Sequence, residues 1–130
     1  MVNWRAVAYG MVTAFVVGII SGLGLPFTDA TLPVVGAGFS GLIAGGVAGY
    51  YSHEGMGGGA LHGLLATTIG GIIVGLVLIV LGTLAAGLGG FGLAVGFLLL
   101  IVASGLPGAV GGAVGAMFRG EEEPMGRPAA

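Results

Sequence analysis

Two histidines and a glutamate lie close together near the middle of the chain. His53 and Glu54 are adjacent, and His62 follows eight residues after Glu54. Two imidazole nitrogens and a carboxylate are ligands that a divalent metal accepts. However, this spacing fits no standard pair of ligands on one helix, and the residues between Glu54 and His62 are mostly glycine. We therefore expect a solvated loop with His62 near the lipid headgroups, and neither a metal nor another cofactor.

No other set of side chains suggests catalysis. The chain has no cysteine, which excludes a disulfide framework, a thiolate metal site and a cysteine nucleophile. Its long apolar stretches hold no acid or base, the groups that would mark a functional site inside a membrane. Hydroxyl groups do occur there, but they usually bond to the backbone one turn earlier; they include Thr13, Ser21, Ser40, Thr67, Thr68 and Ser104. We do not expect an enzyme.

The composition indicates an integral membrane protein. Of the 130 residues, 56% are hydrophobic and 6% are charged, and the mean hydropathy is +1.14. A soluble domain usually has about 25% charged residues. The formal net charge of -2 leaves no basic surface for a nucleic acid, so we expect the lipid bilayer as the partner and no nucleic-acid binding.

Four apolar stretches have the length of transmembrane helices. A helix of about 20 residues spans the hydrocarbon core of a bilayer. The chain therefore predicts an all-α fold, an integral membrane bundle of four transmembrane helices forming one domain over residues 1–118. The spans cover about 6–25, 32–51, 61–84 and 93–118. Three connectors separate them, a proline-flanked turn at 26–33, a flexible loop at 52–59 and a short turn at 87–92. Residues 119–130 form a polar tail that we expect to be disordered.

The second span carries a glycine zipper. Ala37, Gly41, Gly45 and Gly49 recur at every fourth position, so they share one helix face. Small residues on such a face let a neighbouring helix approach closely in a bilayer. Because its few large apolar residues make this span only marginally stable alone, we expect it at the centre of the bundle. Helix packing is likewise predicted for small residues on the other three spans, namely Gly18, Gly22, Gly71, Gly75, Gly108 and Gly112.

The fourth stretch contains a proline. Pro107 removes a backbone hydrogen bond and collides with the carbonyl four residues earlier, so we expect a kink or a break near Ser104 to Leu106. A helix that restarts there would point free N–H groups into the membrane, as the broken helices of transporters do. The alternative is a simple kink.

The two halves of the chain are similar in sequence. At an offset of 53 residues, the run Gly18 to Ile20 matches Gly71 to Ile73, and Gly22-Leu23 matches Gly75-Leu76. Two interpretations stay open. The fold either consists of two tandem two-helix hairpins, or these glycine-rich segments align by chance.

Three sequence segments resemble a known family. They are Met1 to Val7, Ser21 to Pro33, and the His62-Gly63-Leu64-Leu65 start of the third span. Over about residues 1–118 the chain is similar to a haloarchaeal family of small glycine-rich membrane proteins, classified as a domain of unknown function. The resemblance implies four transmembrane helices and a salt-loving archaeal source, but no activity.

The function that we predict is a structural or assembly component of the cell membrane, packed through glycine zippers. Homo-oligomers or complexes with other membrane proteins are possible partners. The alternative is a small transporter or channel subunit that uses the helix break near Pro107. All three arginines lie toward the chain ends, so the positive-inside rule places both termini in the cytoplasm. Asp29 should then face the outside.

Overall fold

The structure, a computed structural model, describes residues 1–24, 32–103 and 105–120. Within these ranges the chain is helical apart from residues 1–3, 53–54 and 120. Four helices follow one another, α1 (Trp4–Gly24), α2 (Leu32–Ser52), α3 (Gly55–Ala103) and α4 (Gly105–Arg119). The prediction of an all-α chain is therefore confirmed. The predicted turn at 26–33 and the predicted tail at 119–130 lie largely outside the described residues.

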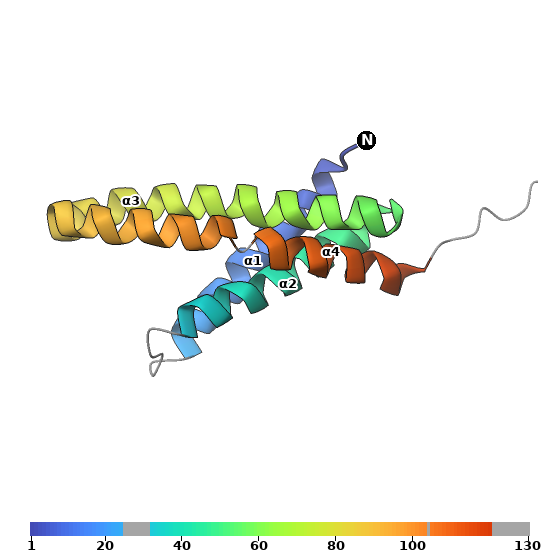
Figure 1. Ribbon diagram of the computed structural model, residues 1–130, viewed down its shortest axis with the longest axis horizontal. Helices are drawn as coiled ribbons and strands as arrows, with labels where there is room; N and C mark the ends of the chain where they lie inside the picture. Colours follow the sequence, from blue (N-terminus) through green and yellow to red (C-terminus); the bar gives the residue numbers. More distant parts are fainter. Residues whose placement is uncertain (25–31, 104, 121–130) are drawn as a thin grey trace, which may run out of the picture.

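α3 is a helical hairpin rather than one straight helix. Its backbone leaves helical geometry at Ala86 and Gly87. The chain reverses there, so that residues 88–103 run back beside the half of the first arm that is nearest the turn (Figure 1). Gly87 has φ +59° and ψ -140°, a conformation that a side chain disfavours. The two arms touch where small residues allow it. Gly90 lies against the Gly82 carbonyl, and Gly75 lies against the side chain of Leu98.

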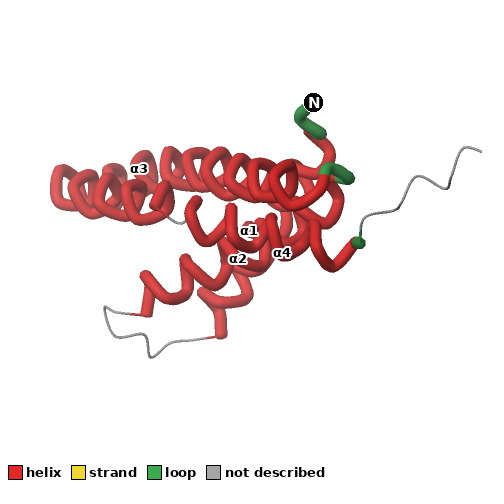
Figure 2. The backbone as a smooth tube through the Cα atoms, turned by 45° about the vertical axis from the view of Figure 1, so that its right-hand side comes forward, coloured by secondary structure: helices red, strands yellow, loops and turns green. Residues whose placement is uncertain are grey.

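α2 and α3 occupy the centre of the fold. Among the described residues, each of them packs against the three other helices, whereas α1 and α4 each pack against α2 and α3 only. α2 and α4 run in the same direction, since Gly45 meets Gly108 and Gly49 meets Gly112. Figure 2 shows α1 and α2 lying together as an antiparallel pair, while the turn end of α3 extends away from the other helices.

The core consists mainly of small side chains. Its main cluster is Val7, Ala48 and Ala66, with Met11 and Leu65 packed around it. Most large apolar side chains lie outside, and Leu84 and Leu88 at the α3 turn are 79% and 89% exposed. A soluble protein rarely exposes so much contiguous apolar surface.

One helical stretch is long and apolar enough to cross a membrane. Among the described residues this stretch is Gly55–Arg119, which includes α3 and α4. Trp4–Val17 is a shorter apolar helix. Only 17% of the most apolar part of that stretch is buried, unlike a core helix of a soluble protein. This is weak evidence for membrane association, and the bundle of four spans remains a prediction.

Two connectors differ from their predicted form. The predicted flexible loop at 52–59 is wrong, because α3 begins at Gly55. Its glycines disfavour a helix in isolation, but Gly59 lies against the Gly112 carbonyl of α4, so the close approach of α4 favours the helical form. The turn expected at 87–92 is reduced to two residues, because the backbone of Gly87 reverses the chain almost alone. Near Pro107, α3 ends at Ala103 and α4 begins at Gly105.

Candidate functional site

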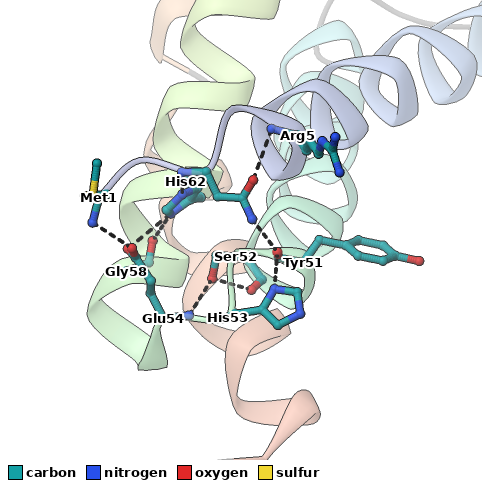
Figure 3. Close-up of polar contacts among 10 residues, drawn as sticks. Met1, Arg5, Tyr51, Ser52, His53, Glu54, Gly58 and His62 are labelled. Atoms are coloured by element: carbon teal, nitrogen blue, oxygen red, sulfur yellow. Dashed lines mark hydrogen bonds and ion pairs between the residues drawn. The ribbon is translucent and has the colours of Figure 1, made fainter.

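Polar side chains gather at one end of the fold. The N-terminal segment (residues 1–3), the end of α2 and the start of α3 meet there (Figure 3). This end also contains His53, Glu54 and His62, the three residues whose types could do chemistry. We call this cluster the polar end.

His62 is completely buried, with 0% of its surface exposed. The backbone N–H of Asn3 donates to Nε2 of the ring at 2.7 Å, and Nδ1 lies 2.7 Å from the carbonyl of Gly58. Because Nε2 accepts a hydrogen bond, the proton of the neutral ring resides on Nδ1, which donates to Gly58. Both ring nitrogens are therefore occupied, and the side chain is a structural link between the N-terminal segment and α3. The expectation that His62 lies in a solvated loop is therefore wrong, because the ring is buried in α3; its place near the lipid headgroups stays a prediction.

Asn3 connects three parts of the chain. Besides the bond to His62, its side-chain amide donates to the carbonyl of Tyr51 at 3.3 Å, and its side-chain oxygen accepts from the backbone N–H of Arg5 at 3.2 Å. This last bond caps the beginning of α1, as an asparagine commonly does. One residue thus ties α1 to the end of α2 and the start of α3.

Glu54 interacts with the N-terminal ammonium. Its Oε1 atom lies 2.9 Å from the Met1 nitrogen, and its Oε2 atom lies 4.0 Å from Nδ1 of His62. The hydrogen bond from the ammonium, assisted by its charge, holds the pKa of the Glu54 carboxyl below the usual value. Glu54 is consequently ionised at neutral pH, and its Oε2 atom faces a ring nitrogen that already lies against the Gly58 carbonyl.

The two histidines do not form one metal site. His53 is exposed, has a positive φ of 60°, and hydrogen-bonds through Nδ1 to the Tyr51 carbonyl at 2.7 Å. His62 uses both of its nitrogens elsewhere. Within the described residues, no group of three potential ligands is close enough to hold a metal ion. His53 instead ends α2 in the left-handed conformation that commonly terminates a helix.

Aromatic side chains surround the polar end. The rings of Tyr9 and Tyr51 lie 5.1 Å apart, and those of Tyr50 and Tyr51 lie 5.4 Å apart. Arg119, in the last turn of α4, donates to the Tyr50 carbonyl at 2.9 Å and lies 5.4 Å from the centre of its ring. Tyrosine and arginine are typical of the boundary between water and hydrocarbon.

Threonine hydroxyls in the helices bond to their own backbone. Thr13 donates to the Tyr9 carbonyl at 2.8 Å, and Thr67 donates to the Gly63 carbonyl at 2.8 Å. Thr67 is buried and lies against Gly108 of α4. These bonds leave the hydroxyls as part of the helix surface rather than as groups aimed at a ligand.

A second set of residues brings α4 against its two neighbours without intervening side chains. A methyl group on Gly45 would collide with the carbonyl of Gly108, and one on Gly49 would collide with that of Gly112. On the other side, a methyl group on Gly63 would also collide with the Gly108 carbonyl. The backbones of α2, α3 and α4 are thus in direct contact. We call this contact the three-helix glycine interface.

The interface involves both predicted and additional residues. Of the predicted packing residues, Gly41, Gly71 and Gly75 are also buried, while the surroundings of Gly18, Gly22 and Ala37 lie outside the described residues. Sequence reasoning did not single out Gly10 or Gly59. Gly10 lies close to Ala66 and Ala48, and Gly59 lies against α4. Spacing could have indicated Gly59, which continues the fourfold series through Gly63, but its glycine-rich neighbourhood resembles a linker.

Two hollows lie between the helices near the polar end. One of about 410 Å³ is bordered by apolar residues of α2 and α4, from Leu42 and Gly111 to Tyr50 and Phe118. The other, of about 700 Å³, is lined by residues that include His53, Glu54 and Arg119. Neither hollow is lined by Gly105 or Pro107.

Comparison with known proteins identifies the family. A family model described as a family of unknown function, DUF5518, matches residues 4–118. The chain therefore belongs to this family. No curated protein matches the chain, and no solved structure matches it.

Proposed function

We propose that this member of the DUF5518 family is a structural or assembly component of the cell membrane, held together by glycine zippers. The observation that supports the proposal best is the three-helix glycine interface. In water, burying glycines gains little, because glycine has no side chain to remove from solvent. In a bilayer, where apolar side chains already lie in hydrocarbon, close backbone approach is the main way in which helices associate.

The distribution of side chains supports the membrane as the surroundings. Large apolar residues cover the outside of α3, whereas the charged groups of the described residues lie at the polar end. With four spans, the polar end and both termini lie on one side. We infer from the positive-inside rule that this side is the cytoplasm.

The alternative function, a small transporter or channel subunit, has less support. A conduction pathway needs polar groups along a water-filled cavity. The two hollows described above are not lined by Gly105 or Pro107, and Gly105 at the start of α4 is buried against Thr68. Flux measurements in liposomes would test this alternative directly, and selective solute movement would favour it.

Membrane extraction combined with one substitution tests the main proposal. Wild-type protein and Gly45→Leu should both resist extraction of membranes with alkaline carbonate, because leucine favours insertion. In mild detergent, Gly45→Leu should lose compact, monodisperse behaviour, since its side chain forces α4 away. Leu78→Ile, a change of shape on α3, serves as the control and should behave as wild type. Release of the wild-type protein by carbonate would refute the membrane location, and an unchanged Gly45→Leu would refute the role of the glycines.

A further inference from the structure

The contact between Asn3 and His62 joins residues 59 positions apart in the chain. It is short, at 2.7 Å between the Asn3 nitrogen and Nε2, and it lies at a fully buried ring. A backbone N–H can only donate a hydrogen bond. The contact therefore exists only while Nε2 carries no proton and can accept.

Protonation of the ring removes this acceptor. Histidine exchanges its second proton within about pH 5–8, and in the charged form both ring nitrogens are donors. Nδ1 already donates to the Gly58 carbonyl, so the added proton must reside on Nε2. It would then face the N–H of Asn3, donor against donor.

We propose that the Asn3–His62 contact is a proton-sensitive latch, in which a second proton on His62 releases the N-terminal segment from the start of α3. The other bonds of Asn3, to the Tyr51 carbonyl and the Arg5 N–H, are exposed and are weak substitutes. Release would free residues 1–3 from the start of α3 while the apolar contacts of α1 with α2 and α3, such as that of Val7 with Ala66, remain.

The charged surroundings of His62 modify the latch but do not replace it. Glu54, on the turn before α3, lies 4.0 Å from Nδ1 and favours the added charge. The Met1 ammonium bonds to Glu54 at 2.9 Å and opposes that charge, as does Arg5 at the start of α1. α4 faces this part of α3 with Gly112 and Ala116, which do not titrate.

Two substitutions separate the latch from other titrations. In His62→Gln the side-chain oxygen can accept from Asn3 and the amide can donate to Gly58, but the group does not titrate in this range. His53→Gln removes the other histidine, which is exposed in the same turn and bonds to the Tyr51 carbonyl instead. Trp4, the one tryptophan of the chain, follows Asn3 directly and reports on the N-terminal segment by fluorescence.

The test is a pH titration of the full-length protein in detergent micelles. We would follow the Asn3 amide and the His62 ring nitrogens by NMR, and the emission of Trp4 by fluorescence. In wild type, all three signals should change together with one midpoint and the slope of a single proton. His53→Gln should keep this transition, and His62→Gln should lose it.

Three results would overturn the latch. The first is an Asn3 amide signal that does not respond while the His62 ring titrates in wild type, a result that needs no variant. The second is a neutral ring that carries its proton on Nε2. The third is a transition that persists in His62→Gln or disappears in His53→Gln, which would assign the proton to another group.

Discussion

Adding one methyl group at Gly45 should destabilise the fold, although the same change favours an isolated helix. Alanine is a better helix former than glycine by about 1 kcal/mol. At Gly45, however, the new carbon would collide with the carbonyl oxygen of Gly108 and would lie 2.7 Å and 2.8 Å from the carbonyl carbon and Cα of that residue. Carbon atoms pack best at about 3.5–4.0 Å, so α2 and α4 must move apart by roughly 1 Å.

The magnitude of this effect follows from the loss of contact along the interface. A gap of about 0.5–1 Å forfeits a quarter to a half of the attraction between packed atoms, and the obstacle at Gly45 is backbone rather than a side chain that can rotate away. Overpacking of this kind typically costs about 1–3 kcal/mol. After the gain of about 1 kcal/mol in helix propensity, we expect Gly45→Ala to lower the free energy of unfolding by up to about 2 kcal/mol.

Gly96→Ala is the matched control. Gly96 lies in the returning arm of α3, and a methyl group there meets nothing within 4 Å. We expect this variant to be as stable as wild type or more stable by up to about 1 kcal/mol. The assay is unfolding in mixed micelles of mild detergent and dodecyl sulfate, followed by circular dichroism. If Gly45→Ala were as stable as Gly96→Ala, direct backbone contact between α2 and α4 would not hold the fold together.

Three further predictions concern the α3 turn, the polar end and the orientation. Gly87→Ala should destabilise the hairpin by about 1–3 kcal/mol through backbone strain alone, whereas Gly89→Ala, also without neighbours within 4 Å, should not; unfolding curves that coincide would contradict this. The pKa of Glu54 is lowered in the folded chain. The ionised carboxylate therefore stabilises the fold fully above the pKa of the unfolded chain, and this stabilisation is lost as the pH falls through the lower pKa of the folded chain. In thermal unfolding between about pH 6 and 3, the stability of Glu54→Gln should therefore fall slightly less than that of wild type, and this difference should shrink with added salt. A cysteine introduced by Asp29→Cys should react with an impermeant thiol reagent on intact cells, and reaction only after the cells are opened would reverse the proposed orientation.

The helical class could be predicted from the sequence because it depends on composition and length. The two-residue turn at Ala86 and Gly87 could not, since charge-free glycines continue to residue 92 and each could have reversed the chain. The start of α3 at Gly55 could not be predicted for a related reason. Glycine favours a linker by local propensity, and only the proximity of α4 to Gly59 reverses that preference.

The polar end shows a different limit of sequence reasoning. His53, Glu54 and His62 attract attention because they are the titratable residues of that segment. Their spacing gives no sign that His62 is buried or that its partner is the backbone of Asn3. That contact depends on how α1 approaches α3. Its donor is a backbone N–H, which every residue except proline has, so the residue type at position 3 does not indicate it.

The packing of both α2 and α3 against α4 has a consequence for how the protein is made. α4 is the last of the described helices to leave the ribosome, yet α2 and α3 both rest their glycine faces on it. Until α4 has been synthesised, Gly45 and Gly63 have no backbone of α4 to pack against. The three-helix glycine interface can therefore form only after the synthesis of residues 105–119.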